Sequence, residues 1–259
     1  MILKYFDTHA HFNDRAFEND IEIELKECRD KNVEYIVNVG YNKESSLDSI
    51  KLSEKYDYIY AAIGIHPSEI YSTKVDDIYN IYEKNSDKKI VAIGEIGLDY
   101  TCRDDDKQNQ KKFFIEQIEL ANTLKLPIFV HTRNASKDTY DILKNDKCPE
   151  YGMILHCFNP TDDFIRLILE KNYMVGFGGN ITYPRKKSFK DYVKKIPLSN
   201  IVLETDAPYL TPEPFKGTRN SSKYLNLICK KLAEYLDMNE EELSQIVYDN
   251  SKRFFKIHE

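Results

Sequence analysis

Short apolar runs rich in β-branched and aromatic residues alternate along the chain with longer stretches in which apolar residues recur every three or four positions. The first pattern predicts strands, and the second predicts helices that bury one face. The predicted strands lie near 2–7, 35–39, 59–63, 90–94, 128–131, 153–156, 174–178 and 201–205. The predicted helices lie near 18–31, 43–55, 75–85, 107–124, 136–145, 161–171, 186–195, 222–236 and 240–255.

Strands that alternate with helices and are apolar on both faces predict a parallel sheet covered by helices. Eight such strands can close into a (β/α)8 TIM barrel, a fold of about 250 residues. An open doubly wound sheet would carry a glycine-rich turn after its first strand, and Asp7-Thr8-His9-Ala10-His11 is unlike one. We therefore predict the α/β class and a (β/α)8 barrel, with residues 1–259 forming a single domain.

Net charge, cysteine spacing and the length of apolar runs limit the classes of protein to which the chain can belong. The net charge of −6 argues against binding nucleic acid through a global basic field. The five cysteines are scattered and never spaced as CxxC, which indicates neither a disulfide framework nor a zinc ribbon. No apolar run approaches the length of a membrane span, and the first residues lack the layout of a signal peptide. We expect a cytoplasmic protein with no membrane contact, and no obligate protein partner is evident.

The chemistry-bearing residues gather at the ends of predicted strands. Five of the six histidines lie at or just past a strand end: His9, His11, His66, His131 and His156. The acidic residues Glu95 and Asp206 close two further strands. Imidazole and carboxylate are ligands for divalent metals, and the strand ends on one face of a barrel converge although they are distant in sequence. This pattern predicts a metal-dependent hydrolase.

Spacing suggests roles for individual ligands. His9 and His11 are two residues apart, so on a strand they share a face and can reach one ion. Glu95 ends an apolar strand, where a carboxylate needs a cation or a hydrogen-bond network, and a structural salt bridge is the alternative. Asp206 is placed to bind a metal and to accept a proton from the attacking water. Glu204 is better explained as orienting a histidine or an arginine.

Other residues are candidates for substrate contact. Arg133 shares a face with His131, and its guanidinium suits a phosphate or carboxylate, although it could instead pair with Glu95 or Asp206. His66 can contact substrate or can cap the next helix. A run of arginine and lysines over 185–195 can follow a phosphate backbone, but a solvated helix face explains it more simply.

Several motifs together resemble one known family. They are Asp7-Thr8-His9-Ala10-His11-Phe12, Gly64-Ile65-His66-Pro67, Gly94-Glu95-Ile96-Gly97-Leu98-Asp99-Tyr100, His131-Thr132-Arg133, His156-Cys157-Phe158 and Glu204-Thr205-Asp206-Ala207-Pro208-Tyr209-Leu210. In this order they resemble the TatD family of metal-dependent deoxyribonucleases. Segments 216–220 and 250–254 resemble the closing motifs of that family, so the resemblance covers the whole chain. One departure is that Arg219-Asn220 continues into Ser221-Ser222, where the family usually has Glu-Pro.

The resemblance implies a barrel of the amidohydrolase type in which two divalent metals hydrolyse phosphodiesters in DNA. By matching position, the implied metal ligands are His9, His11, Glu95, His131, His156 and Asp206. Asp206 and Glu95 are the predicted catalytic residues. Glu95 is expected to touch both ions, because a carboxylate can bridge two metals and a histidine cannot. His66, Arg133 and Arg219 are the implied contacts to the substrate phosphate.

The sequence does not decide which reaction the protein catalyses, and three interpretations follow. The leading interpretation is an exonuclease acting on single-stranded DNA ends, with RNA or tRNA as further substrates to be tested. One alternative is an ester hydrolase such as a D-aminoacyl-tRNA deacylase, because the same activated water serves both. A non-catalytic nucleic-acid-binding protein is another, but its signature would be a lost ligand, and all six ligands are present. Four imidazoles suit Zn²⁺ or Mn²⁺, whereas Mg²⁺ prefers oxygen ligands, and activity with Mg²⁺ stays open.

Overall fold

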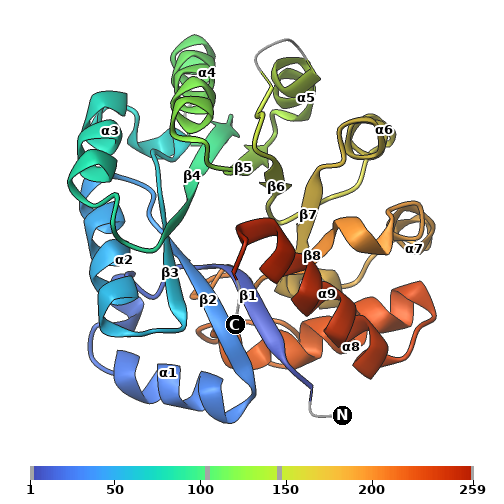
Figure 1. The fold of residues 1–259 in the computed structure, drawn as a ribbon. Coiled ribbons are helices and arrows are strands. Elements are labelled where there is room, and N and C mark those ends of the chain that lie inside the picture. The colour runs from blue at the N-terminus through green and yellow to red at the C-terminus, as the bar shows by residue number, and fades with distance from the viewer. Residues whose placement is uncertain (1–2, 103–105, 145–147, 258–259) are drawn as a thin grey trace. The chain divides into compact units, whose positions relative to one another are not determined.

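The computed structural model describes residues 3–102, 106–144 and 148–257 (Figure 1). Its strands are β1 (Tyr5–Ala10), β2 (Val33–Val39), β3 (Ile59–Ile63), β4 (Ile90–Asp99), β5 (Ile128–Arg133), β6 (Met153–Leu155), β7 (Met174–Phe177) and β8 (Ile201–Leu203). Residues 2 and 145, at the edges of a predicted strand and a predicted helix, lie outside the described residues.

The α-helices follow the strands in the predicted alternation. They are α1 (Ile21–Asp30), α2 (Lys43–Lys55), α3 (Val75–Lys84), α4 (Lys107–Leu124), α5 (Ser136–Lys144), α6 (Asp162–Lys171), α7 (Ser188–Val193), α8 (Leu225–Leu236) and α9 (Glu240–Phe255). Short 3-10 helices are η1 (Arg15–Phe17), η2 (Pro67–Glu69), η4 (Gly179–Thr182), η5 (Leu198–Asn200) and η6 (Ser222–Tyr224). Within the described residues, none of these helices is both long and apolar enough to cross a membrane.

The eight strands form one sheet in which each strand neighbours the next in sequence order, from β1 to β8. The pairs β3–β4, β4–β5, β5–β6 and β7–β8 are parallel. A parallel sheet in sequence order, with helices between its strands, confirms the predicted α/β class and the (β/α)8 barrel.

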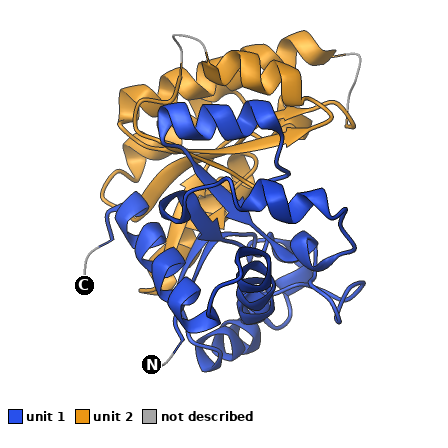
Figure 2. Cartoon of the chain, turned by 90° about the vertical axis from the view of Figure 1, so that its right-hand side faces the viewer, with its two compact units in different colours: residues 1–37, 157–259 blue, residues 38–156 orange. Residues whose placement is uncertain are grey.

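The chain divides into two compact units, which Figure 2 distinguishes by colour. Unit 1 contains residues 1–37 and 157–259, and unit 2 contains residues 38–156. The single-domain organisation of residues 1–259 stays a prediction.

In unit 2, β4 is longer than the sequence predicts. The prediction ended this strand at 94, but it continues to Asp99 past an irregularity in its pairing with β5 between Ile93 and Ile96. Such irregularities redirect side chains and are common next to active sites. The pairing then resumes with Gly97 beside His131, where a side chain on Gly97 would collide with the His131 carbonyl. The Gly97 backbone, with φ of 139°, also requires glycine.

In unit 1, β1 ends at Ala10 and not near 7 as predicted. The strand is prolonged because the segment after β8 pairs with it, through a parallel bridge between Ala10 and Ala207. The Asp206 amide donates to the His9 carbonyl at 2.8 Å, and the His11 amide donates to the Ala207 carbonyl at 2.7 Å. Tertiary pairing of this kind leaves no local pattern in the sequence.

A fully buried carboxylate secures this pairing. Asp7 accepts hydrogen bonds from the His9 amide at 3.2 Å and from the Thr205 amide at 2.9 Å. It also accepts from the hydroxyls of Thr205 at 2.5 Å and Ser222 at 2.6 Å. Burial raises the pKa of Asp7 to about 7, although these four donors pull it down. Asp7 therefore joins β1 to two segments about 200 residues away in sequence.

We predict that Asp7→Asn lowers the free energy of unfolding by about 2 kcal/mol or more. The side-chain amide of asparagine would point an N–H group at the groups that donate to Asp7, and at least one of these donors would lose its acceptor. Ser222→Ala is the matched control, since it removes a single donor and should cost about 1 kcal/mol. Urea denaturation followed by circular dichroism measures both, and equal stabilities of the two variants would contradict the role assigned to Asp7.

Candidate metal centre

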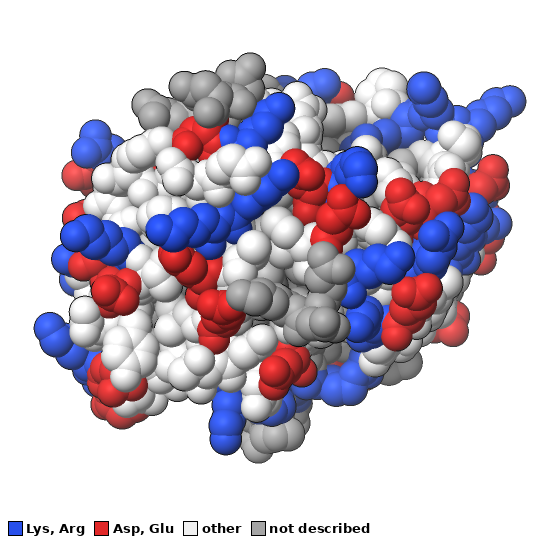
Figure 3. Space-filling view, turned by 90° about the horizontal axis from the view of Figure 1, so that it is seen from above, with Lys and Arg blue, Asp and Glu red and all other residues white. Residues whose placement is uncertain are grey.

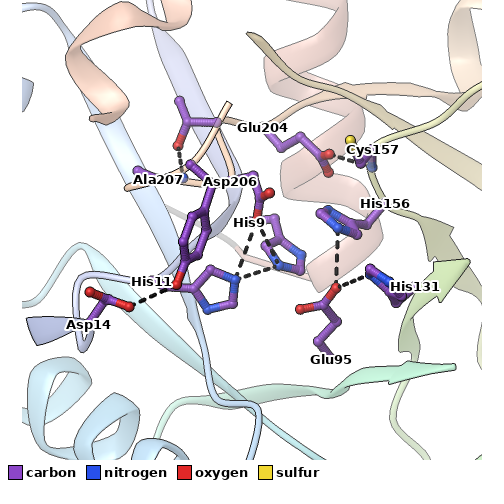
Figure 4. Close-up of polar contacts among 12 residues, drawn as sticks. His9, His11, Asp14, Glu95, His131, His156, Cys157, Glu204, Asp206 and Ala207 are labelled. Atoms are coloured by element: carbon purple, nitrogen blue, oxygen red, sulfur yellow. Dashed lines mark hydrogen bonds and ion pairs between the residues drawn. The ribbon is translucent and has the colours of Figure 1, made fainter. Parts of the chain in front are cut away.

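Unit 1 brings three of the predicted ligands together. His9 Nε2 lies 3.2 Å from His11 Nε2. The Asp206 Oδ1 atom lies 3.4 Å from His11 Nε2 and 3.9 Å from His9 Nε2 (Figure 4). Both histidines are buried, and one ligand atom of each of the three residues lies within 4.8 Å of the others. We call these residues the unit 1 cluster.

The backbone around Asp206 is held in an unfavourable conformation. Its φ is 59°, in the left-handed region that non-glycine residues rarely adopt. The conformation is fixed by the hydrogen bond from its amide to His9 and by a bond of 2.7 Å from the Tyr209 amide to its carbonyl. Strain of this kind is concentrated at functional sites.

Unit 2 forms a second cluster around Glu95, which we call the unit 2 cluster: Glu95, His131 and His156. The Glu95 Oε1 atom lies 2.8 Å from His131 Nδ1 and 3.2 Å from His156 Nε2. Glu95 and His156 are buried, and Figure 4 shows both imidazoles facing the same carboxylate. The cost of burying the carboxylate is therefore offset by two imidazole partners.

Asp99 is a site residue that the sequence analysis did not single out. Its Oδ2 lies 3.1 Å from His131 Nε2, so His131 has a carboxylate at each ring nitrogen. Burial alone would lower the pKa of His131, but these two hydrogen bonds outweigh it and raise the pKa. Burial would raise the pKa of Asp99, yet its bonds with His131 and Thr101 hold that pKa well below its usual range. The spacing of four residues from Glu95 on one strand was the available signal.

His66 fulfils one of the two roles that its sequence position suggested, the capping of the next helix. Its Nδ1 accepts a hydrogen bond from the Ser68 amide at 3.1 Å, which caps η2. Its ring also lies edge-on against His131, with the ring centroids 4.6 Å apart. His66, Asp99 and His131 form another group whose ligand atoms lie within 4.8 Å of one another. Substrate contact by His66 stays a prediction.

Glu204 is completely buried and supports the segment that follows His156. Its Oε1 accepts the Cys157 amide at 2.5 Å. Cys157 has a left-handed backbone with φ of 49°, and its sulfur is 3.0 Å from Asn180 Nδ2. Glu204 fits here only because residue 176 is glycine, since a Cβ at that position would overlap Glu204 Oε2. Glu204 therefore orients the backbone of Cys157, and its predicted role in orienting a histidine or an arginine stays a prediction.

The two predicted phosphate-binding arginines differ in their surroundings. Arg133 is exposed at the end of β5. Arg219 is held by carboxylates, with its Nη2 at 2.6 Å from Asp20 and at 2.8 Å from Glu24, and it also lies over the Phe17 ring. Substrate contact by Arg219 stays a prediction, and it would require Arg219 to exchange one of these partners.

Three of the basic residues in the run over 185–195 pair with acidic ones. Lys190 and Lys194 both pair with Asp237, at 2.5 and 2.6 Å. Lys195 lies 3.2 Å from Asp162. On the face of the molecule drawn in Figure 3, basic and acidic side chains are likewise interspersed. These ion pairs favour the interpretation of this run as a solvated helix face.

The donor set of each cluster fits a divalent metal. Each contains two imidazoles and a carboxylate with their ligand atoms directed at one another, which is the mixture of donors that Zn²⁺ and Mn²⁺ accept. Burial supplies the shielding from water that strengthens such bonds. A (β/α)8 barrel with histidines and carboxylates at the ends of its strands is an architecture of metal-dependent hydrolases.

The comparisons with known proteins agree with this class. Residues 6–256 match the family described as "TatD related DNase". The chain belongs to the TatD family of metal-dependent hydrolases, as the sequence motifs predicted.

Individual relatives cover the whole chain. It is 39% identical over 253 residues to the uncharacterized metal-dependent hydrolase YabD of Bacillus subtilis, covering 98% of this chain and 99% of the relative. The crystal structure of YjjV, a TatD homologue from Escherichia coli, superposes with a TM-score of 0.91 at 28% identity and covers 100% of both chains. A TatD family hydrolase from Entamoeba histolytica, 24% identical, shares the fold with a TM-score of 0.84, covering 98% of both chains.

We predict that Glu95→Gln lowers the total metal bound by the purified protein. The amide keeps the shape of the side chain but loses the charge that attracts a cation, so the unit 2 cluster should lose most of its affinity. Glu54→Gln is the matched control, because Glu54 pairs with Lys88 away from both clusters. Elemental analysis after dialysis gives the stoichiometry. Unchanged metal content in Glu95→Gln would show that Glu95 is not a metal ligand and that it only forms a structural salt bridge with His131.

Proposed function

We propose that this protein is a metal-dependent nuclease that hydrolyses phosphodiester bonds at single-stranded DNA ends. The observation that carries the proposal is the presence of two imidazole–carboxylate clusters in a chain whose family is described as TatD related DNase. His9, His11 and Asp206 would hold one divalent cation, and Glu95, His131 and His156 would hold a second. The bridging role of Glu95 stays a prediction that rests on the ability of a carboxylate to bind two metals.

Bound divalent cations supply Lewis acidity, which activates water and neutralises charge on a phosphate. The residues of the chain do the remaining work. The Asp206 carboxylate is partly accessible, with 14% of its side chain exposed, and accepts a proton from the attacking water. The hydrogen bonds of its backbone with His9 and Tyr209 fix the Cα position from which this carboxylate projects toward His9 and His11.

Substrate recognition must be local, because the net charge of the chain is −6. Arg133 is suited to this task, since its exposed guanidinium carries paired donors that match the non-bridging oxygens of a phosphate. It follows His131 by two residues on β5, and on a strand this spacing directs both side chains to the same face.

The proposal is tested by incubating the protein with single-stranded DNA labelled at either end, in Mg²⁺, Mn²⁺ and Zn²⁺, with D-aminoacyl-tRNA in parallel. We expect stepwise shortening of the DNA in at least one metal, and the label that is lost first identifies the polarity. Deacylation of the tRNA without DNA cleavage would favour the ester hydrolase instead. Binding of DNA without either reaction would favour a non-catalytic protein.

We predict that Asp206→Asn abolishes hydrolysis and leaves the fold intact. The substitution removes charge and basicity with almost no change in volume, so the thermal melting curve should be unaffected. Near-normal turnover in the purified variant would show that another group accepts the proton.

We also predict that Arg133→Lys weakens cleavage at least tenfold, which corresponds to about 1.4 kcal/mol. The variant keeps the positive charge and loses the paired donors. The content of bound metal should not change, because arginine is not a ligand. Arg166→Lys on α6 is the control, since Arg166 is exposed and lies beside Asp163. Wild-type activity in Arg133→Lys, or loss of its metal, would mean that the phosphate is held elsewhere.

A further inference from the structure

An exposed aromatic ring lies beside the unit 1 cluster. Tyr209, in the segment that follows β8, is 51% exposed. Its ring centroid is 6.2 Å from that of His11, at an angle of 65°. A single exposed aromatic residue on a surface needs no explanation. This one is distinguished by its closeness to a proposed metal ligand.

The Tyr209 ring is anchored by hydrogen bonds at its hydroxyl and along its backbone. Its hydroxyl donates to Asp14 Oδ2 at 2.9 Å. Its amide bonds the Asp206 carbonyl, and its own carbonyl accepts from Asn220 Nδ2 at 2.6 Å. Asp14 is itself fixed, because its other oxygen accepts the Ala16 amide and caps η1. An aromatic face that is ordered before binding gives up little conformational entropy when a ligand stacks on it.

The same segment offers a second aromatic face and a cation. Phe215 is 43% exposed and stacks on Tyr224, with centroids 5.0 Å apart. Lys216 is exposed, with its ammonium group 4.3 Å from the centre of the Tyr183 ring. Aromatic faces next to cations are the means by which proteins bind single-stranded nucleic acid without reading its sequence, because every base has a stacking face.

We propose that Tyr209 is a specificity-determining residue whose ring stacks on the base of the nucleotide being cleaved. This inference rests on the proposed nuclease function. With the phosphate at the unit 1 cluster, the attached base would meet the adjacent ring of Tyr209. The site would then require a base at the reacting end and would accept any of the four. A flexible single strand can present its base in this way, whereas a paired base is already stacked within a duplex.

A structural role for Tyr209 makes a different prediction. If the residue only ties its segment to Asp14, the hydroxyl matters and the ring face does not. Tyr209→Phe keeps the face and removes the hydroxyl, whereas Tyr209→Leu removes the face. Tyr209→Trp enlarges the face and provides a second test if the leucine variant folds poorly. Tyr79→Leu is the matched control, because Tyr79 is 42% exposed on α3, in unit 2.

The experiment measures binding and cleavage of two fluorescent single-stranded oligonucleotides. They are identical except that the nucleotide at one end carries its base in the first and is abasic in the second. Binding is followed by anisotropy in Mg²⁺ at a temperature that slows turnover, and also in chelator. We expect wild type, Tyr209→Phe and Tyr79→Leu to bind the normal end at least about fivefold more tightly than the abasic end. Tyr209→Trp should discriminate at least as well, and Tyr209→Leu should bind both ends equally weakly.

Two results would overturn the inference. One is wild type that binds or cleaves both ends equally, and the other is Tyr209→Phe that loses as much discrimination as Tyr209→Leu. Cleavage of DNA without discrimination would remove the stacking role and leave the nuclease proposal standing. Failure to cleave DNA in any of the three metals would instead remove the proposed function.

Discussion

The buried carboxylate of Asp7 is the interaction on which the chemistry of unit 1 depends. Asp7 accepts hydrogen bonds from the backbone amides of His9 and Thr205, and Thr205 directly precedes Asp206. It therefore positions the backbone from which the His9 imidazole and the Asp206 carboxylate project. Ligand atoms only 3.4 Å apart require their backbones to be fixed far more tightly than apolar packing alone achieves. A buried carboxyl group with four donors supplies that accuracy, because each hydrogen bond it loses is costly.

In unit 2, side chains and not backbone hydrogen bonds position the proposed ligand His131. Glu95 and Asp99 hold His131 from opposite ring nitrogens, an arrangement that suits an imidazole with a proton on each. An imidazole must give up one of these protons before it can bind a metal. If His131 holds a cation as proposed, metal binding in this unit would therefore be coupled to proton release, and the affinity for metal would fall in acid. The carboxylates also keep the ring oriented before any cation arrives.

The sequence predicted the alternation of strands and helices because buried strands and one-sided helices have distinct apolar periods. The strand ends were predicted less well. The final residues of β1 and β4 are ordered by pairing with distant segments, as Ala10 is with Ala207. Asp99 was missed for this reason, since the predicted strand ended near 94 and the observed strand continues to Asp99. The ion pair between Arg219 and Asp20 could not be predicted from the sequence either, because its partners are 199 residues apart.

Gly176 has a consequence for how this protein can change over evolution. Any side chain at that position would occupy the space of the Glu204 carboxylate, which in turn holds the backbone of Cys157. A substitution at either position alone leaves an overlap or a void, whereas a larger residue at 176 combined with a shorter one at 204 restores the packing. Positions 176 and 204 should therefore covary among relatives, although neither side chain belongs to the proposed ligand set.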